Sequence, residues 1–474
     1  MIFGANYVPA DYYREYIADT FLGGASTSQF SINYRGSGFG TPYELGEFKV
    51  PKYRLDSLTF GKGSFTRSAS EVILAALNNR TMKVNMPGPE GPDGKPTKVL
   101  DVEETDSANA KIQEIRNGFE DWLALPKNSA KVKVIADNYN RLYNRTIPTE
   151  YKTNFVEPVG CTIDFRPHQK EAIARGLLGD DLLLDHSPGL GKTYILTGLA
   201  MEMKRTGLAQ KTLLICMKAN VQDIAKDFLK AYPNANILCP SEADFAKKNR
   251  HTFLNRIKTN SYDCVILSHD QYCKLRHSEA AVERVVDEYF ADYENVLAEK
   301  RKRLEEDPYA SNAKTIANEI RQLEKARETF VTNINSANNG NTKNPKDPIT
   351  FEELGFDKIM VDESHQFKNL KFVTGLEQVS GLGSAAGSSK ALMLLLGVRS
   401  IQHVNGGDRG VVFASGTPIV NSLVEMYNQI KYLKPSYLEM VDQRSVDAWL
   451  GQCGIISTET EITALMKTQD VTRV

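Results

Sequence analysis

The chain has 474 residues, more than a single hydrophobic core normally accommodates, so we expect two or more domains. Hydrophobic residues make up 41% and charged residues 25% of the sequence, which excludes a largely disordered chain. The 58 Lys and Arg residues against 59 Asp and Glu give a net charge of −1, which excludes the basic character of histone-like nucleic-acid binders. Any contact with nucleic acid therefore has to come from a local patch.

The sequence carries no sign of export or of membrane insertion. Its N-terminal stretch lacks the basic and apolar segments of a signal peptide, and no run approaches the roughly 20 apolar residues of a membrane span. The six cysteines form no CxxC pair, and Cys216 and Cys264 lie in apolar runs typical of buried strands. We therefore expect a cytoplasmic protein with reduced thiols, no zinc site and no membrane partner.

Residues 1–157 are predicted to form an accessory α+β domain. Ser68 and Glu71 have the spacing of a capping box at the start of an apolar helix. Apolar residues at helical spacing predict further helices over 107–126 and 130–145. Periodicity of this kind usually marks a packed core, and the region contains no catalytic constellation.

Six short apolar runs alternate with helical stretches in residues 158–474. These runs are DLLLDH, KTLLICM, ANILCP, CVILSH, KIMVDE and GVVFASG. Strands that alternate with helices predict a parallel sheet with helices on both faces. The predicted fold class of this region is therefore α/β, in one lobe over 158–474.

A charged insertion over 277–335 separates the fourth and fifth of these runs. Apolar residues at three-and-four spacing predict two helical arms, and Pro308 breaks them into a hairpin. Mixed-sign charge is typical of a solvated arm, and the alternative is an arm that touches DNA or a partner through the EKRKR run at its tip. The Asn-rich segment 336–350 that follows is predicted to be a flexible loop.

The sharpest chemical signal is LLLDHSPGLGKTYILTGLA, an apolar strand followed by a glycine-containing loop and a helix. Phosphate binding needs inward-pointing backbone N–H groups, a helix N-terminus, an ammonium group and a hydroxyl for the metal. Lys192 would reach the terminal phosphates of ATP and Thr193 would ligate Mg²⁺, although His186 replaces the first glycine of the usual GxxxxGK[ST] pattern. The phosphate loop itself has four residues: Pro188, Gly189, Leu190 and Gly191.

A second signal, KIMVDESHQFKN, is an apolar strand that ends in Asp362 and Glu363. Ligands bind beyond the carboxyl ends of parallel strands, so this pair would face the phosphate loop. Asp362 would hold Mg²⁺, and Glu363 would polarise the attacking water. Acidic pairs at strand ends are also common as solvated turns, but the upstream phosphate loop favours catalysis. Lys192, Asp362 and Glu363 are therefore the predicted catalytic residues, and Thr193 and Asp362 the predicted metal ligands.

The order of FRPHQ, PGLGKT, DESH and SGTP resembles that of the superfamily-two helicases and translocases, most closely the Swi/Snf-like group with its DEAD/DEAH-box ATPase lobe. This resemblance implies a RecA-like P-loop NTPase, an ATP hydrolase that uses ATP and Mg²⁺. It also implies that Arg166 and Gln169 belong to the motif that recognises adenine, and that His365 contributes to nucleotide binding. Gln169 as a polar residue on a helix surface remains the alternative.

The same resemblance assigns two groups of residues to nucleic-acid binding. One group lies in and after SGTP, where nucleotide state is coupled to the nucleic acid: Ser415, Gly416, Thr417 and Asn421. The other follows two strands and is expected to contact the phosphodiester backbone of DNA, most simply of a duplex: Lys218, Asn220, Ser268 and His269. Polar residues at strand ends are often only loop residues, which is the alternative for both groups.

A narrower resemblance extends over nearly the whole chain. VPADYYREYI, FEDWLALP, FEELGFDKIMVDESHQFKNL and NGGDRGVVFASGTPIVNSLVEMY are similar to the central part of the large helicase and DNA adenine methylase proteins of phages and conjugative elements. This implies a bacterial host cell, with a phage as one source of the gene. The chain has no NPPY or DPPY motif, so a methylase domain is expected only as a partner.

The family continues into a second RecA-like lobe that supplies arginine fingers, whereas this sequence stops at Val474 soon after SGTP. An arginine finger is worth roughly 10³ to 10⁵ in turnover, so we expect nucleotide binding with poor hydrolysis unless a longer parent protein or a partner supplies that lobe. The alternative function is a nucleotide-dependent module that binds DNA or a partner without motor activity alone. A third alternative is a structural protein of the phage particle or transfer apparatus whose ATPase core has lost its function. Such a protein would bind no nucleotide.

Overall fold

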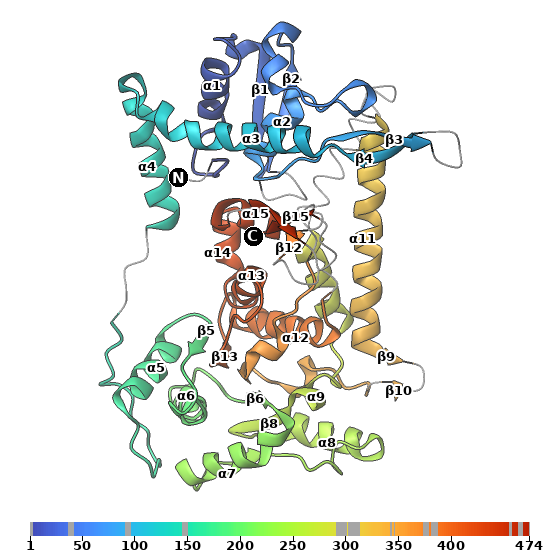
Figure 1. Ribbon diagram of the computed structural model, residues 1–474. Coiled ribbons are helices and arrows are strands. Elements are labelled where there is room, and N and C mark those ends of the chain that lie inside the picture. The colour runs from blue at the N-terminus through green and yellow to red at the C-terminus, as the bar shows by residue number, and fades with distance from the viewer. Residues whose placement is uncertain are drawn as a thin grey trace. The chain divides into compact units, whose positions relative to one another are not determined.

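The computed structural model describes residues 3–36, 42–90, 96–144, 150–290, 301, 313–341, 344–345, 347–372, 379–380, 387–454, 457–462 and 468–473. Contacts divide the chain into two compact units (Figure 1). The first unit comprises residues 1–147, 373–382 and 439–474, and the second comprises residues 148–372 and 383–438.

A six-stranded sheet in the order β5-β13-β11-β6-β8-β7 forms the centre of the second unit. Every neighbouring pair in it is parallel, which confirms the predicted RecA-like α/β fold. Its strands correspond to the six predicted runs: β5 (Leu182–Asp185), β6 (Thr212–Cys216), β7 (Ile237–Leu238), β8 (Cys264–Ser268), β11 (Lys358–Asp362) and β13 (Val411–Ser415).

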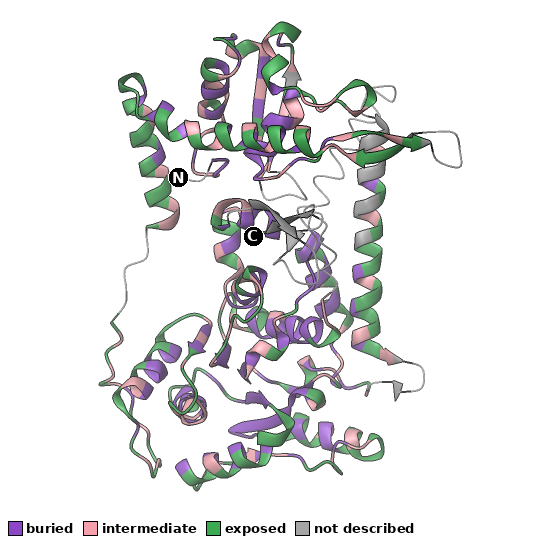
Figure 2. Cartoon of the chain, viewed as in Figure 1, coloured by how far each residue is buried: buried purple, intermediate pink, exposed green. Residues whose placement is uncertain are grey.

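The central strands are apolar throughout because helices cover both faces of the sheet. All five residues of β11 are buried, and its side chains alternate between two hydrophobic clusters, with Ile359 and Val361 in one and Met360 in the other. Figure 2 shows the same burial along the sheet and in α12. As predicted, Cys216 and Cys264 lie buried in their strands.

The helices of the second unit follow the strands in alternation. They are α5 (Pro167–Leu178), α6 (Lys192–Arg205), α7 (Val221–Ala231), α8 (Lys247–Thr259), α9 (His269–Tyr272), α12 (Ser389–Asn405), α13 (Leu423–Leu433) and, at the boundary between the units, α14 (Pro435–Met440), with the 3-10 helices η6 (Lys218–Asn220), η7 (Glu352–Leu354) and η8 (Ser364–Phe367). Helices α5, α6 and α7 contribute to the cluster of Met360, whereas α8 and α12 contribute to that of Ile359.

The predicted hairpin insertion contains a helix over 279–290 and a second helix, α11 (Ala313–Asn339). The predicted break at Pro308 lies outside the described residues, as does the basic run at its tip apart from Arg301. The predicted loop 336–350 begins too early, because α11 continues to Asn339. The side chain of Asn338 explains this extension, since it bonds the backbone N–H of His277 at 2.7 Å and its carbonyl at 2.9 Å. A short ribbon of β9 (Gly340–Asn341) and β10 (Asn344–Pro345) follows.

The first unit is built from short elements around an aromatic core that includes Tyr13, Tyr16 and Phe119. The predicted capping box is present, with Ser68 and Glu71 at the start of α2. Its helices are α1 (Ala10–Thr20), α2 (Ala69–Leu77), α3 (Val102–Leu123), α4 (Ser129–Tyr143) and α15 (Val446–Cys453), with 3-10 turns η1 (Thr27–Gln29), η2 (Lys52–Arg54), η3 (Asp56–Leu58), η4 (Gly63–Phe65) and η5 (Pro126–Asn128). Its strands are β1 (Phe30–Tyr34), β2 (Tyr43–Phe48), β3 (Asn85–Glu90), β4 (Pro96–Leu100), β12 (Val379–Ser380), β14 (Ser457–Ile462) and β15 (Thr468–Arg473).

The division into units differs from the sequence-based boundary, which placed all of 158–474 in one lobe. Residues after α14 belong to the first unit, where three side chains from the N-terminal region hold them. The amide of Asn6 donates to the carbonyl of Val441 at 2.6 Å, and that of Asn79 donates to Gly454 at 3.2 Å. The hydroxyl of Tyr143 donates to the side chain of Gln452 at 2.7 Å.

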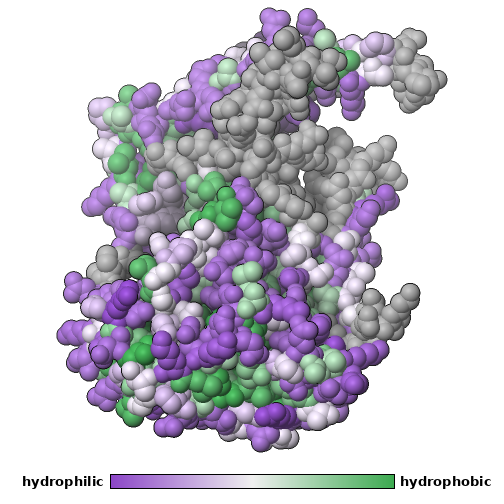
Figure 3. Space-filling view, turned by 60° about the horizontal axis from the view of Figure 1, so that its bottom comes forward, coloured by the Kyte–Doolittle hydropathy of each residue, from purple (hydrophilic) through white to green (hydrophobic). Residues whose placement is uncertain are grey.

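Hydrophilic residues cover most of the described surface on the face shown in Figure 3, with smaller apolar patches between them. Among the described helices, none combines the length and the apolar character that crossing a membrane would require.

Candidate functional site

The phosphate loop and the Asp362–Glu363 pair emerge at the same edge of the sheet. Asp362 pairs with Ala414 of β13, and Ala414 pairs with Leu184 of β5. One strand therefore separates the two segments, and the usual spacing between strands places their backbones about 10 Å apart. This is the carboxyl edge, where open α/β sheets bind ligands.

Two glycines give the phosphate loop its shape. Gly189 and Gly191 have φ values of 87° and 78°, in the left-handed region that side chains disfavour. At Gly191 there is also no room, because a Cβ atom would lie 2.4 Å from Nε2 of Gln169. Gly191 is the N-cap of α6, so the loop delivers its backbone N–H groups to the positive end of that helix.

Lys192 is the first residue of α6 and folds back over the loop. Its Nζ donates a hydrogen bond of 2.8 Å to the carbonyl oxygen of His186. An ammonium group has three N–H donors, so this bond is compatible with additional phosphate contacts. His186, which replaces the first glycine of the usual motif, thus contributes a backbone carbonyl that positions Lys192.

Asp362 and Glu363 have different environments although they are adjacent. The side chain of Asp362 is buried, and burial together with the charge of Glu363 raises its pKa to about 6, although the positive charge of Lys192 acts in the opposite direction. Glu363 has φ 54° and ψ 49°, a left-handed conformation that costs a residue with a Cβ about 1–2 kcal/mol. Such strain is characteristic of functional sites.

His365 connects this pair to the segment after β13. Its Nδ1 lies 3.1 Å from Oε2 of Glu363 and 3.1 Å from Oγ of Ser415. Ser415 is fully buried, and its Oγ accepts a 3.1 Å hydrogen bond from the backbone N–H of Thr417. The structure thus joins four of the predicted site residues in one polar chain.

Gly416 brings the same segment against the phosphate loop. A Cβ atom at this position would lie 3.1 Å from Cδ of Pro188, closer than most side-chain contacts. The glycine therefore permits a close approach between the two loops. Of the fourth residue predicted in this group, Asn421, the backbone N–H donates to Glu425 at 3.2 Å and the side chain is exposed.

Gln169 holds the phosphate loop in this structure. Its Oε1 accepts from the backbone N–H of Arg166 at 2.9 Å, and its Nε2 donates towards the carbonyls of Leu190 and Gly191 at 3.4 Å each. The side chain is buried, whereas Arg166 is exposed at the start of α5. The resemblance assigns the Gln169 side-chain amide to adenine recognition, but in this structure that amide contacts the phosphate loop.

The four predicted contacts to the DNA backbone divide into two pairs. Lys218 and Asn220 are exposed in η6 after β6, and Lys218 forms a 2.7 Å ion pair with Glu242. Ser268 and His269 are 3% and 6% exposed, so the prediction of surface contacts fails for them in this structure.

The side chains of both buried residues are used inside the protein. The Oγ of Ser268 caps α9 by accepting from the N–H of Gln271 at 3.1 Å. The Nε2 of His269 lies 2.8 Å from the carbonyl oxygen of Asp362, and its ring meets Phe367 edge to face at 4.9 Å. His269 therefore supports the acidic pair from behind.

Glu425 and Lys368 are site residues that the sequence analysis missed. The carboxylate of Glu425 accepts from the backbone N–H of Val420 at 2.7 Å and pairs with Lys368 at 3.0 Å. Lys368 directly follows η8. The Glu425–Lys368 ion pair is therefore a second link between the segment after β11 and the segment after β13. An acidic residue in the first turn of a helix that follows a glycine-containing loop was the available signal.

The donor set at the acidic pair fits a magnesium ion. Thr193 and Asp362 offer hydroxyl and carboxylate oxygens, which are the ligands that Mg²⁺ prefers. The raised pKa of Asp362 reflects two carboxylates held close together under burial, and a divalent cation would relieve that repulsion.

Comparisons with known proteins find matching family models, a phage relative and a similar solved structure. A family model described as a Probable helicase domain matches residues 179–473, and one described as a domain of unknown function (DUF8437) matches residues 2–145. The Defense against restriction protein B of Escherichia phage P1 is 22% identical over 365 residues, which cover 68% of this chain and 15% of that protein. A similar solved structure is the Sulfolobus solfataricus SWI2/SNF2 ATPase core in complex with dsDNA, with 13% identity, a TM-score of 0.32 and coverage of 61% of this chain and 39% of that one.

The chain spans a small part of the length of its phage relative. The helicase-domain match, in contrast, extends over more than half of this chain and contains the phosphate loop, the acidic pair and the segment after β13. The chain therefore belongs to the Probable helicase domain family.

Proposed function

We propose that this chain is the ATP-binding and ATP-hydrolysing lobe of a DNA helicase or translocase from a phage or mobile element. The observation that carries the proposal is the polar chain from Glu363 through His365 to Ser415, beside the loop that presents Lys192. A site that only bound nucleotide would not need its acidic residue linked to the segment after β13.

In the proposed reaction each residue has one task. The loop N–H groups and Lys192 bind the phosphates, and Glu363 orients and polarises the attacking water. His365 contacts both the carboxylate of Glu363 and the hydroxyl of Ser415, so a shift of one of these groups would move the other. Mg²⁺, held by Thr193 and Asp362, would neutralise charge on the phosphates.

The proposed track is DNA, as the resemblance of the motif order to that of the Swi/Snf-like translocases implies. Lys218 and Asn220 are the remaining candidates for backbone contacts. A second RecA-like lobe, in a longer protein or in a partner, would complete the site, with a methylase domain as a further partner. The setting would be the cytoplasm of a bacterial host.

Steady-state ATP hydrolysis by the purified chain at low salt, with and without duplex DNA, tests this proposal. We expect nucleotide binding with slow turnover that Glu363→Gln removes while nucleotide affinity is retained. Binding of nucleotide and DNA with no turnover under any condition would instead favour a nucleotide-dependent binding module. Failure to bind ATP at millimolar concentration would refute both functions.

A further inference from the structure

Helix α13 touches the candidate nucleotide site at its N-terminal end. Glu425, in its first turn, is 4% exposed and accepts from the backbone N–H groups of Val420 and Asn421 while it pairs with Lys368. Further along the helix, Nδ2 of Asn428 donates to the carbonyl of Lys368 at 2.8 Å. The segments after β11 and β13 are therefore both fastened to this one helix.

The C-terminal end of α13 is fastened to the hairpin insertion through Arg399 of α12. The guanidinium donates to the carbonyls of Lys431 and Tyr432 at 2.8 and 3.2 Å, where the helix leaves carbonyl groups open. It also forms a two-bond contact with the carboxylate of Glu288 in the hairpin, at 2.6 and 2.7 Å. Beside it, the ammonium of Lys431 lies 3.4 Å from the ring centroid of Tyr289.

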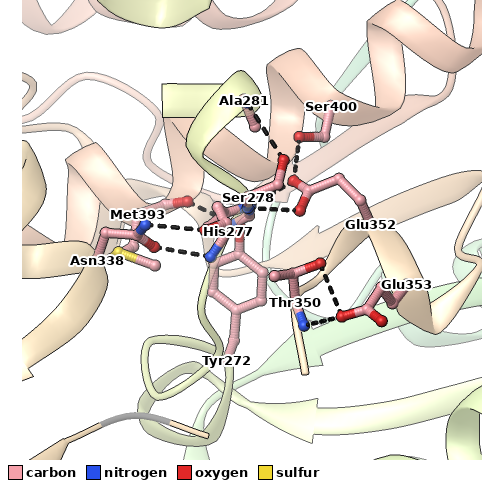
Figure 4. A network of polar contacts seen from close by, with 10 residues as sticks. All are labelled: Tyr272, His277, Ser278, Ala281, Asn338, Thr350, Glu352, Glu353, Met393 and Ser400. Carbon is pink, nitrogen blue, oxygen red and sulfur yellow. Dashed lines mark hydrogen bonds and ion pairs between the residues drawn. The ribbon is translucent and has the colours of Figure 1, made fainter. Parts of the chain in front are cut away.

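The root of the hairpin cannot pivot freely against α12, because a buried network fixes it (Figure 4). Glu352 accepts from the backbone N–H of Ser278 at 2.8 Å and from Oγ of Ser400 at 2.7 Å, and lies 3.0 Å from Nδ1 of His277. Asn338 of the returning arm clamps the backbone of His277 from the other side. The start of the first arm is thus joined to α12 through Glu352, and the returning arm is bonded to the same point at His277.

We propose that α13 is a strut that couples the hairpin insertion to the nucleotide site, with Glu425 and Arg399 as positioning residues at its two ends. A displacement of the segment after β13 moves Glu425, the helix carries the shift to Arg399, and Arg399 carries it to Glu288. Packed helices transmit such shifts because tightly packed interiors do not deform continuously. This inference rests on the proposed function, since it requires a nucleotide to occupy the site.

The test measures amide hydrogen exchange over residues 279–290 in the full chain, with and without a non-hydrolysable ATP analogue and Mg²⁺. Nucleotide affinity is measured in parallel by fluorescence titration. For the wild-type chain we expect the analogue to slow exchange in this segment by about fivefold or more, the lower end of usual coupling between sites. In Arg399→Lys, this slowing should disappear while the analogue binds with wild-type affinity, because lysine cannot form the two-bond contact. In Glu425→Gln, the slowing should disappear at a concentration of analogue that saturates the site.

Two further variants separate coupling from simple support. Glu288→Gln changes only the hairpin partner of Arg399. In this variant too, the analogue should no longer slow amide exchange over 279–290. Lys226→Ala removes an exposed 3.1 Å ion pair with Asp223 on α7 and should keep it. A purely structural role would instead raise exchange equally with and without the analogue and leave their ratio unchanged.

The outcomes distinguish this inference from the proposed function. A wild-type chain that binds the analogue without any change over 279–290 overturns the strut alone. The strut is also overturned if the three variants keep the wild-type ratio. A wild-type chain that does not bind the analogue refutes the proposed function, and the strut falls with it.

Discussion

The carboxyl ends of β5, β11 and β13 differ from those of β6 and β8 in how their polar residues are used. After the first three strands, side chains and backbone groups bond one another around Glu363, His365 and Ser415. After β6, Lys218 lies at the surface and pairs only with a neighbouring loop, whereas after β8 the polar side chain of His269 turns inward.

This difference shows that one sheet edge contains two kinds of polar surface. A group that is proposed to act on a ligand, such as Glu363, is held within a chain of polar contacts that continues through His365 to Ser415. For a group that is proposed to contact a repetitive backbone, as Lys218 is, one exposed charge would suffice. Substitutions of the first kind of residue should reduce nucleotide binding or hydrolysis strongly. Substitutions of the second kind should reduce DNA affinity slightly.

Among these substitutions, Lys192→Ala should have the largest effect, and the quantity that it changes is nucleotide affinity. Removing the ammonium from the loop should weaken nucleotide binding more than about 100-fold, because bonds to charged groups are the strong ones. Fluorescence titration with an ATP analogue measures this. Lys218→Ala is the matched control and should bind the analogue normally, and equal affinity in both variants would break the comparison.

Asp362→Asn should make the protein more stable at neutral pH while it impairs Mg²⁺-dependent binding. The folded-state pKa of Asp362 is raised to about 6, so its favourable contribution is complete below about pH 4 and is lost as pH rises through 6. Without Mg²⁺, the substitution should raise the free energy of unfolding by on the order of 3 kcal/mol at pH 7.5 and by little at pH 4. Urea denaturation at both pH values checks this, and an effect independent of pH would contradict it.

His269→Ala should reduce stability and leave DNA affinity unchanged. The substitution removes the bond to the carbonyl of Asp362 and the contact with Phe367, and such losses typically cost about 2 kcal/mol. Urea denaturation and fluorescence anisotropy with a duplex measure the two quantities. Weaker DNA binding at unchanged stability would return His269 to the surface role that its motif implied.

Lys218→Ala should have the smallest effect. Loss of one exposed phosphate contact should weaken duplex binding at low salt by about threefold and reduce the slope of log K against log salt by about 1. Anisotropy titrations at several salt concentrations measure this. A slope equal to that of the wild-type chain would remove Lys218 from the proposed interface.

The sheet and the position of the nucleotide site could be predicted because both depend on local patterns. A strand buried on two faces must be apolar at every residue, which is visible in KIMVDE and GVVFASG. Parallel strands then bring the ends of β5 and β11 to one edge, whatever the connections between them. The predicted loop residues and acidic pair accordingly lie at that edge.

The directions of side chains and the long-range partners could not be predicted in the same way. His269 follows a strand just as Glu363 does, but its ring points inward, where it contacts Phe367 and the carbonyl oxygen of Asp362. Glu425 and Arg399 act through residues 57 and 111 positions away in the sequence, as their contacts with Lys368 and Glu288 show. No periodicity or motif encodes such pairs, because they depend on how helices meet.

The first unit combines three chain segments, 1–147, 373–382 and 439–474, so a ribosome synthesises the last of them only after the whole second unit. The side chains of Asn6, Asn79 and Tyr143 are made early, but their partners between Val441 and Gly454 come 309 to 435 residues later. At typical elongation rates, this delay lasts about 15–90 seconds. The second unit is thus fully translated before these contacts within the first unit can form.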